Sequence, residues 1–155
     1  DFEVVLKDSD KKFAEEFIQE LGLKRLCRVS REHINTQFDT QVLTVFKAII
    51  NVSPDVIKDI INDDQTVTTI VSKVDSDDNA VRELSMKLLV TLIIVEDDDL
   101  SDLATTKIMA SLLDSARSRG YRNRWKSVVS HISVNEVDGS GSFEYDNYAL
   151  VLINF

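Results

Sequence analysis

The residues whose types and spacing come closest to metal chemistry lie between positions 75 and 86. Asp75, Asp77 and Asn79 supply oxygen ligands at every second residue, as at the start of a calcium-binding loop. Such a loop needs glycine at its sixth position for a tight turn and glutamate at its twelfth as a bidentate ligand. The sequence has Ala80 and Met86 there. We therefore expect no calcium site, and interpret the three side chains as capping groups for a helix that begins near Ala80.

Catalytic chemistry has little support elsewhere in the chain. His33 and His131 lie outside any nucleophile or metal motif, and a lone Cys27 is expected to fill core space. The Gly/Ser stretch at 138–142 lacks the lysine and the preceding strand of a phosphate-binding loop, so we expect a flexible loop there. The prediction is a non-enzymatic protein that needs no cofactor or metal. A single cysteine cannot form an internal disulfide, which favours a reducing, cytoplasmic compartment.

Charge is distributed unevenly. The net charge is −9 and the isoelectric point about 4.7, so nucleic acid and anionic membranes are poor partners for the chain as a whole. Five basic residues form a cluster that is interleaved with Tyr121 and Trp125. Its members are Arg117, Arg119, Arg122, Arg124 and Lys126. This cluster is suited to an acidic partner or to lipid headgroups, although ordinary solvated charge at helix ends is the simpler interpretation.

The elements that position these residues are helices. Val42, Val45, Phe46, Ile49 and Ile50 have the spacing of one stripe on an amphipathic helix. The same reading predicts further helices along the chain. The one at 79–95 is apolar on most sides, so we place it in the middle of the fold. No apolar run reaches the length of a transmembrane segment.

Two end signals are also expected. Gly22 is predicted to be the left-handed residue that ends a first helix, and Thr66 the cap of a short one. Glu96 to Asp99 are expected to form a solvated link that supplies acid to the start of the next helix.

The helices fall into threes, which indicates a repeat. The predicted groups are 10–21, 23–29 and 36–51; 54–61, 67–74 and 79–95; and 100–116, 121–132 and 143–155. Asn51 and Val95 end the long third helices 44 residues apart, within the roughly 40 to 47 of armadillo and HEAT units. Three helices per unit favour armadillo. We predict an all-α armadillo-type solenoid of about three repeats, forming one domain over 1–155. We expect it to be a fragment of a larger protein.

Several segments resemble a known family. Residues 46–51 (FKAIIN) and 86–92 (MKLLVTL) resemble third-helix motifs of the N-terminal regulatory region of formins, the armadillo-built GTPase-binding and formin-homology-3 segment. Residues 124–132 (RWKSVVSHI), followed after a polar loop by 148–154 (YALVLIN), are similar to the next stretch of that region. Trp125 and the polar insertion look most like the FHOD branch.

The resemblance implies a function in actin assembly. In formins this region binds a helix from the C-terminal autoregulatory segment of the same protein, and a Rho-family GTPase relieves the contact. Matching the motifs places Lys47, Ala48, Asn51, Lys87 and Thr91 in the groove that would hold this helix. The implied location is cytoplasmic and cytoskeleton-associated.

A second family remains open. Residues 13–18 (FAEEFI), followed by Gly22 and Leu23, also resemble the armadillo-like region of ELMO-type scaffolds, which act in GTPase exchange-factor complexes. The chain would then be an adaptor rather than an autoinhibitory module.

Overall fold

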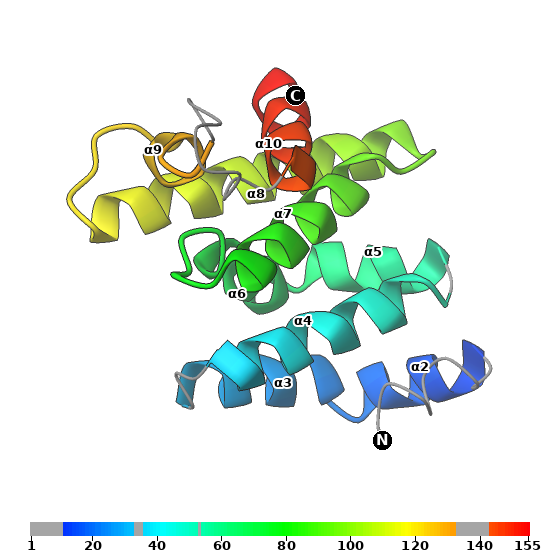
Figure 1. Ribbon diagram of the computed structural model, residues 1–155. Coiled ribbons are helices and arrows are strands. Elements are labelled where there is room, and N and C mark those ends of the chain that lie inside the picture. The colour runs from blue at the N-terminus through cyan, green and yellow to red at the C-terminus, as the bar shows by residue number, and fades with distance from the viewer. Residues whose placement is uncertain (1–10, 33–35, 53, 133–142) are drawn as a thin grey trace.

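The computed structural model describes residues 11–32, 36–52, 54–132 and 143–155, and the structural statements below refer to these residues. They form helices joined by turns and contain no β-strand, so the expected all-α class is confirmed. The helices are α2 (Lys11–Gln19), α3 (Gly22–Glu32), α4 (Thr36–Ile50), α5 (Pro54–Asn62), α6 (Asp64–Ser72), α7 (Asn79–Ile93), α8 (Asp98–Ser118), α9 (Lys126–Val129) and α10 (Phe143–Asn154) (Figure 1). Asp10, His33 and the loop at 138–142 lie outside the described residues.

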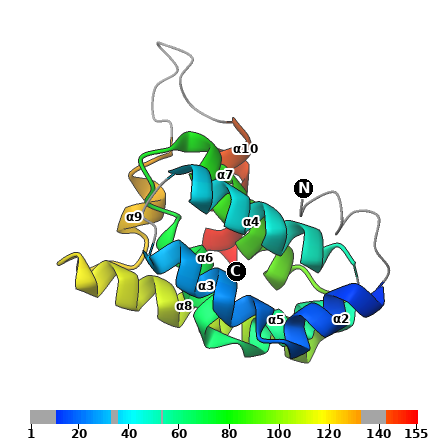
Figure 2. The same cartoon turned by 90° about the horizontal axis from the view of Figure 1, so that it is seen from below.

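Two rows of helices make up the molecule. In the first row α4 packs against α7, and α7 packs against α10 (Figure 1). In the second row α3 packs against α6, and α6 against α8. Seen from below, α4 and α7 lie on one side and α3, α6 and α8 on the other (Figure 2). The residues that the sequence assigned to long third helices therefore share one side of the molecule.

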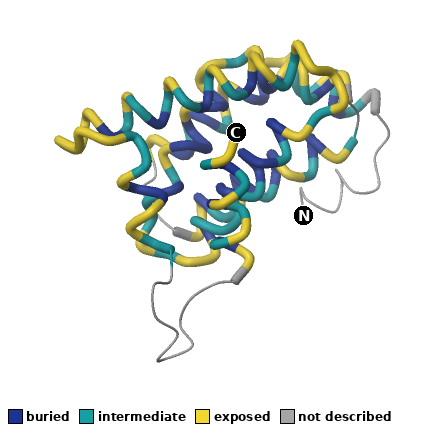
Figure 3. The backbone as a smooth tube through the Cα atoms, turned by 90° about the horizontal axis from the view of Figure 1, so that it is seen from above, coloured by how far each residue is buried: buried dark blue, intermediate teal, exposed yellow. Residues whose placement is uncertain are grey.

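The core runs between the two rows, and α7 lies at its centre. This helix contacts α4, α6, α8 and α10, and Met86, Leu89 and Leu92 are fully buried on it. Leu88 is also buried, with 2% of its surface exposed. The expectation of a helix that is apolar on most sides and lies mid-fold is confirmed. Buried positions face the interior of the stack, whereas exposed positions cover its outside (Figure 3).

The stripe predicted on α4 is the contact face of that helix. Val42, Val45, Phe46, Ile49 and Ile50 are all buried, and they pack into the same core as α7. Since burial of each large aliphatic side chain contributes about 1.5–3 kcal/mol, this stripe fixes the orientation of α4. The side chains on the opposite face of α4 are exposed or only partly buried.

Aspartates cap three of the helices. Asp63, Asp78 and Asp97 precede α6, α7 and α8, and each accepts hydrogen bonds from backbone N–H groups of the first turn. The prediction that Thr66 is a cap was wrong. Thr66 is a buried residue of the first turn of α6, and both its backbone N–H and its hydroxyl donate to the Asp63 carboxylate. The acidic link before α8 does what was expected, because Asp97 caps that helix while Asp98 and Asp99 lie in its first turn.

The turn between α2 and α3 differs from the prediction. Leu21 has the left-handed backbone conformation, with φ of 61°, and Gly22 is instead the first residue of α3. Gly22 is needed for space, since a Cβ atom there would lie 2.4 Å from the ring of Phe17 and 2.5 Å from its carbonyl oxygen. Glycine is therefore required at position 22 by the close packing of α2 on α3, and not by a left-handed backbone conformation.

The second helix of the third group is much shorter than expected. The sequence predicted helix over 121–132, whereas α9 spans only Lys126–Val129. Gly120 ends α8 with φ of 76°, and the residues up to Trp125 form turns. The physical reason is that Asn123 accepts a hydrogen bond from the backbone N–H of Trp125, an alternative to helical bonding.

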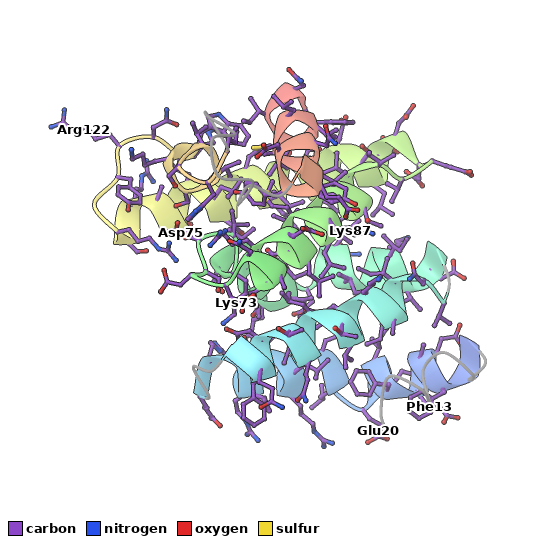
Figure 4. The ribbon with its side chains drawn as sticks, in the orientation of Figure 1. Phe13, Glu20, Lys73, Asp75, Lys87 and Arg122 are labelled. Carbon is purple, nitrogen blue, oxygen red and sulfur yellow. The ribbon has the colours of Figure 1, made fainter. Side chains whose placement is uncertain are left out.

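One ionic contact joins α4 to the end of α6. Lys73 Nζ lies 2.7 Å from Asp39 Oδ1, and 14% and 10% of the respective side chains are exposed. Ser30 of α3 donates its hydroxyl proton to the same carboxylate oxygen at 3.2 Å. Three helices are thus tied together at one nearly buried carboxylate (Lys73 is labelled in Figure 4).

Candidate partner-binding surface

The outer face of α4 carries three of the five residues predicted to hold a partner. Lys47 is exposed, Ala48 is half-buried, and Asn51 is exposed in the turn just after the helix. The backbone N–H of Asn51 donates to the carbonyl of Lys47 at 3.2 Å, which carries the helical geometry one residue further. Ala48 lies off the buried stripe, at the margin of the core, against which its partly buried side chain packs.

The other two predicted residues form one turn of α7. Lys87 and Thr91 are both half-buried, and the Thr91 hydroxyl donates to the carbonyl oxygen of Lys87 at 2.8 Å. This bond satisfies the hydroxyl donor of Thr91 within the helix.

Tyr148 of α10 completes this part of the surface, and sequence reasoning missed it. The Lys87 ammonium lies 6.0 Å from the centre of the Tyr148 ring, at the outer limit of a cation–π contact between α7 and α10. Tyr148 had been assigned only to the closing apolar stripe of the chain. Its register against Lys87 depends on how α10 packs on α7, and no local pattern gives that register.

A continuous surface results from these helices, because α7 contacts both α4 and α10. We call it the third-helix surface and define it by the five predicted residues together with three half-buried neighbours. The neighbours are Thr44 of α4, Leu84 of α7 and Tyr148 of α10. Thr44 lies one turn before Ala48, and Leu84 one turn before Lys87, so helical spacing could have found both. Figure 4 shows Lys87 on this side of the molecule, where α7 meets α10.

The surface combines small and apolar groups with two cations. The apolar part of the surface is a strip formed by the partly buried Ala48 and Leu84, and Lys47 and Lys87 carry its positive charge. Such a strip suits the apolar face of an amphipathic helix, with the lysines placed to meet polar groups at its edges. No binding residue is tested by the geometry alone, so the five assignments remain predictions.

The three residues weighed as calcium ligands have different partners. Asp75 forms an ion pair with Arg119 and a contact of 2.8 Å from its Oδ1 to His131 Nε2. Asn79 accepts a hydrogen bond from Arg82, and Asp77 is exposed. Asp78, rather than these three, caps α7. The interpretation of these three residues as capping groups was therefore wrong. Asp75 instead ties the end of α8 to the turn before α7.

His131 belongs to a structural contact. Burial, and to a smaller extent the nearby guanidinium of Arg82, lower the pKa of His131, which favours the neutral imidazole. Its Nε2 lies within hydrogen-bond distance of Asp75 Oδ1, at 2.8 Å. The ring also meets that of Tyr145 edge-on, at 6.4 Å between centres. Tyr145 is buried and donates its hydroxyl proton to the carbonyl of Val128 at 3.0 Å. Burial raises the pKa of Tyr145 to about 12.

Cys27 lies in the core, as expected. Its side chain is fully buried, with Sγ 3.6 Å from the Thr66 hydroxyl, and burial raises the pKa of the thiol. Within the described ranges, no group of three or more His, Cys, Asp and Glu side chains is arranged to hold a metal ion. None of the helices described is long and apolar enough to cross a membrane.

Comparison with known proteins assigns no family. No protein-family model matches the sequence, and no curated protein matches it. The case for function therefore depends on the surfaces described above.

Proposed function

We propose that this chain is a non-enzymatic interaction module, an armadillo-type stack that binds an amphipathic helix on the third-helix surface. The observation that supports the proposal is the packing of α4 on α7 and of α7 on α10, the three helices that the sequence assigns to the third position of successive groups. In stacked repeats of this kind, each unit buries its core against its neighbours and leaves a long face open to ligands. The aligned helices supply that face.

The half-buried side chains on this face favour a helical ligand. Ala48 is small enough to let another helix approach closely, and Thr44 and Asn51 lie on the same face one turn to either side. Across on α7, Leu84 offers apolar contact area beside the Lys87 ammonium. An amphipathic helix laid over this strip would bury its apolar side on Ala48 and Leu84.

The formin resemblance gives the proposal a biological setting. In that setting the ligand is the C-terminal autoregulatory helix of the same protein, and binding of a Rho-family GTPase relieves the contact. Bound in this way, the module would hold actin assembly in check in the cytoplasm, at the cytoskeleton. Two residues of the motif that carries the resemblance are available for this contact in part, since Ala48 is half-buried on α4 and Asn51 is exposed just after that helix.

The decisive experiment uses Ala48→Asp. The aspartate would place an unpaired carboxylate in a contact that excludes water, at a cost to binding of about 2–4 kcal/mol, or on the order of 30-fold or more in affinity. The fold should lose less than about 1 kcal/mol, since Ala48 is only half-buried and aspartate has a modestly lower helix propensity. Calorimetric titration with the C-terminal regulatory helix of the parent protein measures the affinity.

A matched control is available on α8. Ala110→Asp makes the same chemical change at an exposed helical alanine outside the third-helix surface. We expect its affinity for the helix to equal that of the unmodified chain. Equal affinities for all three proteins would remove Ala48 from the binding site, and failure of the unmodified chain to bind would count against the proposed function itself.

A further inference from the structure

The basic segment, residues 117–126, forms a second surface, which differs from the third-helix surface in carrying many positive charges. It contains Arg117, Arg119, Arg122, Arg124 and Lys126, and the sequence has no acidic residue between Asp114 and Glu136. This stretch of the sequence therefore carries a positive charge although the net charge of the chain is −9. This excess of positive charge belongs to this part of the sequence and not to the chain as a whole.

Backbone bonding holds this segment in a defined shape. The N–H of Tyr121 donates to the carbonyl of Ala116 at 2.8 Å, and the N–H of Gly120 to the carbonyl of Arg117 at 3.0 Å. This pair of bonds, with Gly120 in the left-handed conformation, is a Schellman motif that ends α8. Arg119 then anchors the turn to Asp75. The start of the basic segment therefore has a fixed position relative to α8 and to the turn before α7.

Three of the five cations remain available for a partner. Arg119 is paired with Asp75, and Arg117 lies 3.9 Å from Asp114. Arg122 and Lys126 are exposed and Arg124 is half-exposed, and none of these three has a carboxylate partner among the described residues. Arg122 extends into solvent at the edge of the molecule (Figure 4).

Exposed apolar groups accompany these cations. Tyr121 is 37% exposed and Val129 is 48% exposed, at the two ends of the turn and α9. A basic surface with an aromatic and an aliphatic side chain at its margin matches the interface of an anionic bilayer, where cations meet headgroups and amphipathic rings lie at their level.

Shape favours a membrane over an acidic peptide. The turn between α8 and α9 projects from the end of α8, and both side and bottom views place it at the outer limit of the molecule (Figures 1 and 2). A projection can meet a flat surface with several cations at once, whereas peptide ligands are usually held in grooves.

Asp75 and Asp114 lie beside the basic segment and pair with Arg119 and Arg117, whereas the acidic link before α8 is too far away to act on it. Glu96 to Asp99 lie at the opposite end of α8, whose 21 residues span about 31 Å at 1.5 Å per residue. Charges in physiological salt are largely screened beyond about 8 Å. A membrane in contact with Arg122 would therefore experience the basic end of α8 and little of its acidic end.

From these observations we infer that the basic segment is a docking site for anionic lipid headgroups, with Arg122, Arg124 and Lys126 meeting the headgroups and Tyr121 lying at their level. Docking at this end leaves the third-helix surface accessible, because that surface is made by α4, α7 and α10. The inference is independent of the proposed function.

Vesicle co-sedimentation of the 155-residue chain tests the inference. Vesicles of phosphatidylcholine containing about one third phosphatidylserine should bind the chain, and vesicles of phosphatidylcholine alone should not. The combined change Arg122→Ser, Arg124→Ser and Lys126→Ser should reduce binding on the order of 100-fold, because each cation near an anionic surface is worth roughly fivefold. Higher salt should reduce binding of the unmodified chain.

A control with the same net charge separates location from total charge. Lys24→Ser, Arg25→Ser and Lys58→Ser remove three exposed cations outside the basic segment and should leave vesicle binding within about twofold. Equal losses in the two triple variants, or equal binding to neutral vesicles, would overturn the inference. So would binding to a polyglutamate peptide with no binding to anionic vesicles, which would assign the segment to an acidic protein instead. Circular dichroism melting shows that each variant is folded.

Discussion

The contact between Lys73 and Asp39 offers a sharp test of what joins the first group of helices to the second. In Lys73→Met the ammonium is lost while the apolar stem is kept, so the Asp39 carboxylate stays nearly buried and keeps the Ser30 hydroxyl as its hydrogen-bond donor among the described side chains. At 2.7 Å, the gross attraction of the pair is about 6 kcal/mol with an effective dielectric constant of about 20. Desolvation offsets much of this attraction, and removing one partner from a buried pair typically costs about 3–5 kcal/mol. Since a tenth or more of each side chain still meets water, we expect a loss of about 3 kcal/mol.

The double variant Asp39→Leu, Lys73→Met distinguishes an unpaired charge from lost packing. Replacing both partners by apolar groups of similar size removes the desolvation penalty, so stability should return to within about 1–2 kcal/mol of the unmodified chain. Urea unfolding followed by circular dichroism gives the free energies.

A solvated pair of the same length serves as the control. Lys107 Nζ lies 2.6 Å from Asp64 Oδ1, but the Asp64 side chain is 81% exposed. Lys107→Met should therefore cost no more than about 1 kcal/mol. If Lys73→Met also costs less than about 1 kcal/mol, or if the double variant is less stable than the single one, burial of the pair does not have the effect argued here.

Two further predictions concern packing and alkaline pH. Gly22→Ala should destabilise the fold by about 1–3 kcal/mol, because the added Cβ must displace the Phe17 backbone as well as its ring. This cost outweighs the higher helix propensity of alanine. An unchanged urea midpoint would show that α2 can move aside freely. The pKa of Tyr145 is about 12 in the folded chain and about 10 in the unfolded chain, so between pH 10 and pH 12 only the unfolded chain releases the proton. The free energy of unfolding should therefore be unaffected by this group below about pH 10 and fall by roughly 3 kcal/mol as the pH rises from 10 to 12. Tyr145→Phe should abolish that alkaline loss and cost about 1 kcal/mol at pH 7, where the bond to the Val128 carbonyl is missing, as urea titrations at the two pH values would show.

Periodic apolar spacing was enough to predict the helices and most of the core. The stripe from Val42 to Ile50 and the central position of α7 follow from it, because burial in helices repeats every three or four residues. Helix ends were harder, since several nearby polar residues compete to cap one helix. Asp63 rather than Thr66 fills that role before α6, and only the backbone geometry decides between them.

Contacts between distant residues could not be predicted from one sequence. Lys73 and Asp39 join the end of α6 to α4, and Lys87 reaches Tyr148 only because α10 packs on α7 in one register. Neither pair has a local pattern, because register depends on how whole helix faces fit together. The outer face of α4 could be predicted from the sequence for the opposite reason, since all of its residues lie on one helix and follow its periodicity.

The central position of α7 has a consequence for how the molecule comes apart. The principal contacts of α2 are with α3 and α5, so loss of α2 would leave the remaining helices in place. Loss of α7 would separate α4 from α10 and uncover α6 and α8 together. Opening from the ends is therefore a partial event, whereas opening at α7 amounts to unfolding of the whole chain. A helix in that position makes the stack act as one cooperative unit rather than as a row of independent parts.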